Sequence, residues 1–141
     1  MKGGFDRRKS LQELEQDDWG EPTHNSYLVM TIHRLRRKPL ADFTVEDFRL
    51  VLGQRIALPF LIPLAVERLE DHPLAAGDLY PGDLLQAVVR AGDEFWSGHT
   101  DCLQRVRKIV RQVKDLLPSL DEMVRQSVLH VLDDAQRSLA K

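Results

Sequence analysis

The stretch IALPFLIPLAVERLED, residues 56–71, decides the fold of this chain. Its first half carries almost no polar side chain, so a helix formed here is apolar around most of its circumference. Such a helix has to be covered by other elements on more than one side. We therefore expect a central helix in this region. Pro59 and Pro63 both lie near its start, and either of them can stand in its first turn.

The chain after Cys102 shows the longest helical periodicity. Apolar residues recur there at intervals of three and four, which places them on one helix face, and Pro118 divides the series in two. The series predicts two long helices that form an antiparallel hairpin joined at Pro118 and Ser119. Its members are Leu103, Val106, Val110, Val113 and Leu117 before the break, and Leu120, Val124, Val128, Val131 and Ala135 after it.

Shorter helices are predicted in the rest of the chain. Their expected ranges are about 11–18, from Asn25 or Ser26 to a point before Pro39, 45–53, a short helix after Gly77 in YPGDLLQAVVRAG, and one turn from Asp93. No stretch alternates between apolar and polar residues as a strand would. The sequence thus predicts an all-α fold, a single compact domain of about six to seven helices.

Two local patterns add detail to these helices. Three capping boxes pair a hydroxyl side chain with an acid three residues later, namely Ser10 with Glu13, Thr44 with Asp47, and Ser119 with Glu122. The helix before Pro39 has two stripes, Tyr27, Met30 and Arg34 on one and Leu28, Ile32 and Leu35 on the other. The two stripes together predict a broad buried face on this helix.

The length and composition are those of one globular domain. The chain has 141 residues, a formal net charge of −2 and no apolar run near the ~20 residues that a membrane-spanning helix needs. We expect residues 1–9 to form a disordered tail and residues 10–141 to form the domain. The opening MKGGFDRRK is followed by acidic residues rather than by the apolar segment of an export signal, and the single cysteine cannot form an internal disulfide. Both observations predict a cytoplasmic protein that does not bind membranes.

Candidate catalytic and metal-binding residues are few. His99 and Cys102 are close in sequence, but a metal site needs three or four ligands. His130 lies one helical turn from Asp133 and Asp134, a spacing that can orient an imidazole but that a helix surface often produces by chance. No nucleotide-binding, hydrolase or metalloprotease motif occurs. We predict no enzymatic activity, no metal, no cofactor and no small-molecule substrate.

A basic run, RVRKIVRQVK at residues 105–114, favours an alternative, a helical nucleic-acid-binding protein. Five bases along one helix can follow the phosphates of a nucleic acid. They lie opposite the apolar stripe, however, where a solvated face would carry them, and no aromatic side chain lies between them to stack on bases. Direct binding of nucleic acid is therefore the second hypothesis.

The stretch SLQELEQDDWGEP, residues 10–22, carries five carboxylates, no base and one tryptophan. Glu13 has its capping role, but Asp17 and Asp18 lie at the C-terminal end of the expected helix, where the helix dipole disfavours negative charge. A partner with a basic surface would explain them, with the carboxylates steering its approach and Trp19 acting as an anchor. In the alternative interpretation, Trp19 fastens the first helix to the core and the acids are solvated. The residues alone leave both interpretations open.

This stretch, together with LRRKPLADFTVEDFRLVLGQRIAL, LIPLAVERLEDHPLAAGDLYPGDLL and DEFWSGH, resembles a family of immunity proteins from bacterial contact-dependent growth inhibition (CDI) systems. The resemblance runs from about residue 10 to residue 100, and more loosely to Pro118. It implies a non-enzymatic cytoplasmic protein that binds the C-terminal toxin domain delivered by a neighbouring cell. It further implies that the toxin is commonly a nuclease, often one acting on transfer RNA, and that the immunity protein occludes its active site or an adjacent exosite.

The resemblance directs attention to acidic residues as toxin contacts, because a nuclease carries a positively charged cleft for phosphates and carboxylates can occupy it. The first group of expected toxin-binding residues is Glu15, Asp17, Asp18, Trp19 and Glu21. The second group, around the loop before the helix in YPGDLLQAVVRAG, is Asp71, Asp78 and Tyr80.

Overall fold

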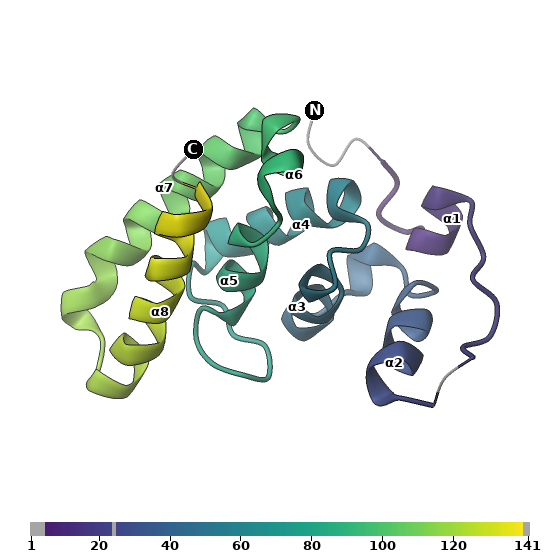
Figure 1. Ribbon diagram of the computed structural model, residues 1–141, viewed down its shortest axis with the longest axis horizontal. Helices are drawn as coiled ribbons and strands as arrows, with labels where there is room; N and C mark the ends of the chain where they lie inside the picture. Colours follow the sequence, from purple (N-terminus) through teal and green to yellow (C-terminus); the bar gives the residue numbers. More distant parts are fainter. Residues whose placement is uncertain (1–4, 24, 140–141) are drawn as a thin grey trace.

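Helix α4 (Leu58–Asp71) runs through the middle of the protein in a computed structural model, which describes residues 5–23 and 25–139 (Figure 1). Residues 61–66 of this helix are all buried. Helices α3 (Val45–Gly53), α5 (Asp83–Val89) and α7 (Thr100–Leu116) pack against α4, so the predicted central helix is confirmed. Because α4 begins at Leu58, Pro59 stands in its first turn and Pro63 lies inside the helix.

The remaining helices extend this centre on two sides. Helix α7 and helix α8 (Glu122–Leu139) form a hairpin at one end, connected by a 3₁₀ turn at Leu117–Ser119, and α5 also packs against α8. Helices α1 (Leu11–Glu15) and α2 (Tyr27–Leu35) lie at the other end, and α2 packs against α3 (Figure 1). A 3₁₀ turn at Leu40–Asp42 and the short helix α6 (Asp93–Ser97) complete the elements.

The predicted all-α fold is confirmed. The described residues contain eight α helices, six of them with seven residues or more, and no strand. The predicted hairpin around Pro118 and Ser119 is also present. None of the helices in the described ranges combines the length and the apolar character that crossing a membrane requires.

Two of the three predicted capping boxes are present. Ser10 and Thr44 each accept a hydrogen bond from the third residue of their helix, whose acidic side chain bonds back to them. The third box, Ser119 with Glu122, is wrong. Helix α8 starts two residues later than that box requires, because the 3₁₀ turn continues to Ser119, and Asp121 Oδ1 accepts the N–H of Val124 at 3.0 Å instead.

Part of the segment that was expected to be a disordered tail contacts α4. The ring of Phe5 packs edge-on against Phe60, with 5.2 Å between the ring centroids. The guanidinium of Arg7 forms two hydrogen bonds of 2.6 and 2.8 Å with the carboxylate of Glu67. Residues 1–4 lie outside the described residues, so the expectation for them stays a prediction.

Asp134 fastens α8 to α5. Its carboxylate accepts hydrogen bonds from Gln86 Nε2 at 2.6 Å and Arg90 Nη2 at 2.5 Å, and Arg137 adds a third at 2.9 Å. Burial favours a higher pKa for Asp134, but the hydrogen bonds from Arg137 and Gln86 and the charge of Arg90 outweigh it and hold the pKa below its ordinary value of 3.8. The contribution to folding is therefore present at neutral pH and is lost as the pH falls below about 4.

We expect Asp134→Asn to lower the free energy of unfolding at pH 7 by about 1–2 kcal/mol, because the amide cannot hold the two arginines as a carboxylate does. The loss of stability on acidification should also be smaller in this variant. Urea unfolding at pH 7 and pH 3.5 measures both effects. Asp133→Asn is the matched control, since Asp133 is exposed on the same helix. Equal stabilities of the two variants at pH 7 would contradict the fastening role.

Candidate functional site

The acidic stretch folds back over the C-terminal end of α2, beside the basic cluster HRLRRK at residues 33–38. Arg36, one residue beyond α2, is only 1% exposed. Its Nη1 forms an ion pair with Glu15, and its Nη2 donates to the backbone oxygen of Asp17 at 2.7 Å. The two clusters of opposite charge therefore lie beside each other, and the buried charge of Arg36 is paired with Glu15. We call residues 16–21 the acidic loop.

Trp19 covers this ion pair. The guanidinium carbon of Arg36 lies 4.2 Å from the centre of the Trp19 ring, a cation–π contact. Trp19 Nε1 donates to Asp17 Oδ2 at 3.3 Å, and the ring packs edge-on against His33. With 42% of its surface exposed, Trp19 is held in one orientation and is still accessible to a partner.

The other carboxylates of the acidic loop point outward. Asp18 Oδ1 accepts the N–H of Gly20 at 2.7 Å, which shapes the turn. Glu21 has an 85% exposed side chain and lies 3.7 Å from Arg37, a loose surface pair. Asp18 and Glu21 are thus the carboxylates that the loop displays, whereas Glu15 already has a structural role. The structure brings all five residues of the first predicted group into one region around Arg36.

The predicted broad buried face of α2 is wrong. Ile32 and Leu35 are buried as expected, but Tyr27 is 75% exposed and Met30 is 49% exposed. Helix α3 packs against α2, and the stripe of Leu28, Ile32 and Leu35 is buried or half-buried, whereas the stripe of Tyr27, Met30 and Arg34 faces solvent. Tyrosine, methionine and arginine are enriched in protein interfaces, so this stripe extends the candidate surface beside the acidic loop.

The second predicted group is divided by the structure. Asp71 is exposed at the end of α4 and forms no hydrogen bond or ion pair with the described residues. Asp78 and Tyr80 lie in the loop before α5, which is fixed by Asp83. The carboxylate of Asp83 is 2% exposed and accepts the N–H groups of Gly77 at 2.7 Å, Leu79 at 3.1 Å and Tyr80 at 3.4 Å.

Helix α3 fixes the same loop from the opposite side. Glu46 Oε1 accepts the N–H of Asp78 at 2.8 Å. Arg49 lies between the two carboxylates, since its Nε donates to Glu46 at 2.7 Å and lies 3.8 Å from Asp83. The hydrogen bond from Arg49 is the main reason why the pKa of Glu46 is lowered. The loop backbone is thus held by two buried or half-buried carboxylates and one guanidinium.

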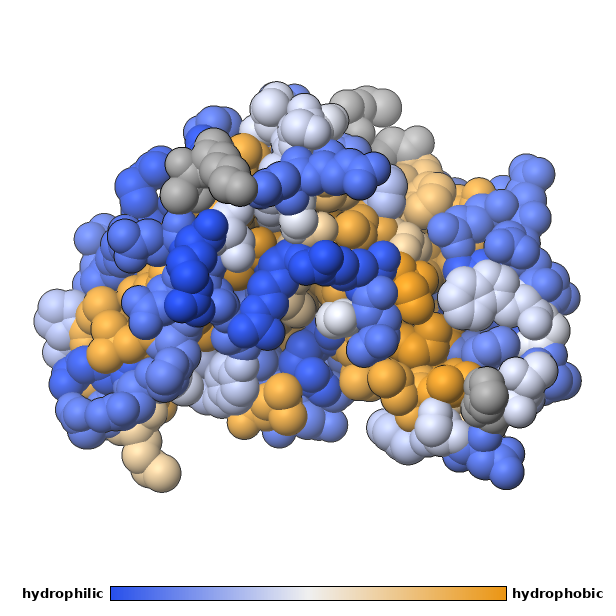
Figure 2. Space-filling view, viewed as in Figure 1, coloured by the Kyte–Doolittle hydropathy of each residue, from blue (hydrophilic) through white to orange (hydrophobic). Residues whose placement is uncertain are grey.

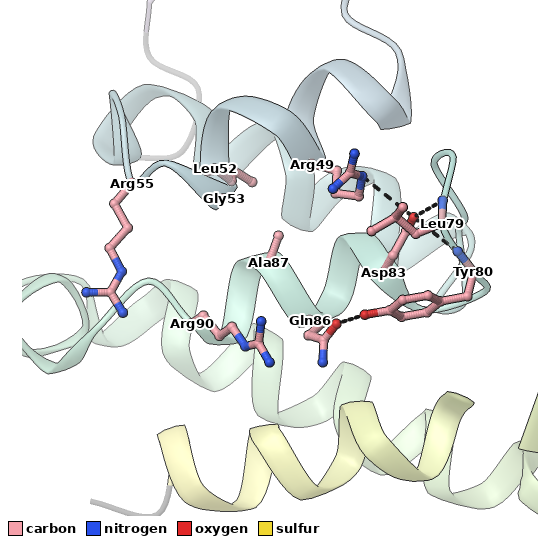
Figure 3. A pocket seen from close by; sticks show the side chains of 10 residues that line it. All are labelled: Arg49, Leu52, Gly53, Arg55, Leu79, Tyr80, Asp83, Gln86, Ala87 and Arg90. Atoms are coloured by element: carbon pink, nitrogen blue, oxygen red, sulfur yellow. Dashed lines mark hydrogen bonds and ion pairs between the residues drawn. The ribbon is translucent and has the colours of Figure 1, made fainter. Parts of the chain in front are cut away.

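Between this loop and the turn after α3 lies an open groove of about 220 Å³, which we call the α3–α5 groove (Figure 3). Arg49, Asp83 and the Tyr80–Gln86 hydrogen bond stand at its loop end, and Arg55 and Arg90 stand at the other end. Figure 2 shows strongly hydrophilic side chains across the middle of the molecule, with apolar side chains beside them. They lie over the region that α3 and α5 occupy in Figure 1. The sequence did not identify Leu79, Arg55 and Arg90 as site residues. No local sequence pattern predicts that the turn after α3 lies beside α5.

The residues considered for catalysis or metal binding have other roles. His99 stacks on Phe95 and bonds to its backbone oxygen through Nδ1 at 2.9 Å, while Cys102 is buried. The carboxylate of Asp134, one helical turn from His130, is engaged with α5. Within the described ranges, no three histidine, cysteine or acidic residues are grouped so that they could hold a metal ion.

Two of the five basic residues in the run on α7 contact neighbouring elements. Arg105 forms two hydrogen bonds with Glu70, of 2.6 and 2.9 Å, and Arg107 donates to the backbone oxygen of Leu139. The other three bases, Lys108, Arg111 and Lys114, are exposed. The solvated face that the helical wheel indicates is therefore present, with two of its members tied to neighbouring elements.

A sequence profile of CDI immunity proteins matches residues 13–106. The chain belongs to the CDI immunity protein family. The resemblance inferred from the sequence blocks is thereby confirmed. No curated protein matches the chain significantly. Membership suggests that the protein binds and neutralises a cognate CDI toxin, and immunity proteins are generally not enzymes.

The part of this CDI immunity protein that matches the family contains both candidate surfaces. It begins at Glu13, before the acidic loop, and it includes the α3–α5 groove and the loop fixed by Asp83. It ends inside α7, so most of the hairpin with α8 lies outside it. The family pattern thus coincides with the elements that position the acidic loop and the groove.

We expect Arg36→Lys to release the acidic loop of the immunity protein. Lysine keeps the charge, but it cannot bond Glu15 and the Asp17 backbone together while stacking on Trp19. In a Trp96→Phe background, in which Trp19 is the remaining tryptophan, its emission should shift to longer wavelength, and stability should fall by about 1–3 kcal/mol. Arg34→Lys, on the exposed stripe, should change neither. Unaltered Trp19 emission in Arg36→Lys would show that other contacts hold the loop.

Proposed function

We propose that this protein binds the C-terminal nuclease domain of its cognate CDI toxin in the cytoplasm, and neutralises it by covering the active site or an adjacent exosite. The observation that carries the proposal is the match of residues 13–106 to CDI immunity proteins. A protein of this kind acts by occupying a surface, so it needs accessible groups on a rigid scaffold rather than a catalytic centre.

The acidic loop supports a nuclease as the partner. A nuclease binds phosphates through positive charge, and Asp18 and Glu21 present carboxylates beside the fixed ring of Trp19. Exposed carboxylates accelerate the encounter with a basic surface, while an aromatic ring supplies contact area at low entropic cost. The proposed contact residues are Glu15, Asp17, Asp18, Trp19 and Glu21, with Asp71, Asp78 and Tyr80 as a second group.

The toxin domain encoded directly upstream should co-purify with this protein and lose its nuclease activity at an equimolar ratio. The assay is cleavage of transfer RNA and other nucleic acids by the toxin, alone and after titration with the immunity protein. A non-cognate immunity protein is the control. Failure of the pair to bind at micromolar concentrations would reject the proposal. Retardation of nucleic acid by the immunity protein alone would instead favour the exposed bases of α7 as its binding site.

Removing the charges of the acidic loop should slow association with the toxin. In the double variant Asp18→Asn, Glu21→Gln, the asparagine can still accept the Gly20 N–H, so the loop keeps its shape while it loses two charges. We expect the association rate to fall severalfold at low salt and its salt dependence to flatten, with the melting temperature nearly unchanged. Glu94→Gln with Asp115→Asn removes two exposed charges elsewhere. Equal association rates for the two double variants would show that the acidic loop is not part of the interface.

A further inference from the structure

The turn between α3 and α4 carries an arginine where a glycine would cost less. Arg55 has a φ of 56°, in the left-handed region. Its N–H bonds to Leu52 O at 2.8 Å, and the N–H of Ile56 bonds to Val51 O at 3.3 Å. These two bonds are those of a Schellman motif, in which glycine usually fills the position that Arg55 occupies. A residue with a Cβ is disfavoured in this conformation, which Gln16 and Ala57 also adopt with φ values of 52° and 55°. Of these three residues, Arg55 is the one that lines the α3–α5 groove.

Arg55 is exposed and forms no hydrogen bond or ion pair with the described residues. Its side chain stands at the same end of the α3–α5 groove as Arg90, and Figure 3 shows the two side chains lying apart from each other. Arg90 has a 56% exposed side chain and bonds to Asp134, which Arg137 also contacts. Two arginines thus share one carboxylate, and with Arg55 this end of the groove has an excess of positive charge.

The other end of the groove displays an apolar side chain on a rigid loop. Leu79 is 59% exposed although the backbone on both sides of it is held by Asp83 and Glu46. Burying a carboxylate is unfavourable unless several donors satisfy it, and here the donors are the loop amides themselves. The loop is therefore ordered before any partner arrives, and an exposed anchor on such a loop binds with little entropic cost.

The size of the groove indicates what can occupy it. About 220 Å³ is less than the ~300–1,000 Å³ of pockets that bind small molecules, but it accommodates a side chain of a partner protein. Each of the two guanidiniums favours a carboxylate of the partner, because it offers parallel N–H donors. The exposed leucine at the opposite end of the groove fits an apolar pocket on the same partner.

We propose that the α3–α5 groove is a specificity site for the toxin, in which Arg55 and Arg90 receive a carboxylate of the toxin domain and Leu79 fills an apolar pocket on it. This inference rests on the proposed function, because the occupant is the cognate toxin domain. In this proposal Arg55 is an interface residue. Its left-handed backbone conformation reduces the stability of the free protein.

The decisive variant is Arg55→Gly, which relieves the left-handed conformation and removes the guanidinium. We expect an increase of about tenfold or more in the Kd for the toxin domain, measured by calorimetry, together with an unchanged or higher melting temperature of the free protein. Lys108→Ala, which removes an exposed charge on α7, is the control and should leave the Kd unaltered. An unaltered Kd in Arg55→Gly would overturn the proposal, and so would a lower melting temperature, since the side chain would then serve the fold.

A second pair of variants tests the apolar anchor. Leu79→Ala should raise the Kd about tenfold, mainly through faster dissociation, whereas Met123→Ala, an 85% exposed residue on α8, should not. An equal Kd for both would show that Leu79 is not a contact. If the wild-type protein does not bind the toxin domain at all, the proposed function fails. If it binds and the Arg55 and Leu79 variants bind equally well, only the groove is rejected.

Discussion

The structure depends on the need to bury helix α4. Its residues 61–66 are buried on all sides, which no two-helix arrangement can achieve, so α3, α5 and α7 have to meet around it. Full burial of a leucine or isoleucine side chain contributes roughly 1.5–3 kcal/mol, and this run places several of them in sequence. Covering α4 brings the end of α3 beside α5, and the α3–α5 groove is the surface seam that results.

Several carboxylates in this protein connect elements of the fold, although most of the described carboxylates are exposed. Asp83 gathers the amides of one loop, Asp134 joins α5 to α8, and Glu15 pairs with the buried Arg36. Each has several donors or a cation, which is the condition under which a buried charge is tolerated. An acidic sequence is therefore an ambiguous sign of a binding surface. Only the exposed carboxylates that do not connect elements of the fold, such as Asp18, are available to a partner.

Much of the fold could be predicted from the sequence, because helix periodicity and capping are local. The central helix, the hairpin and the boxes at Ser10 and Thr44 required no knowledge of distant residues. Exposure was harder to predict. Tyr27 and Met30 form a stripe as regular as the buried one, and only the position of α3 decides which of the two is covered. The burial of Arg36 could not be predicted locally, because it depends on a loop that returns from α1.

The end of α3 shows why function has to be sought where local rules are broken. Gly53, the last residue of α3, stands in a helical conformation where a Cβ would meet no atom within 4 Å, so this position does not require glycine. Two residues later, where glycine would be favoured, the chain has an arginine. Stability alone would favour another residue at position 53 and glycine at position 55. The guanidinium that this turn places at the α3–α5 groove is the feature on which the proposed specificity site rests.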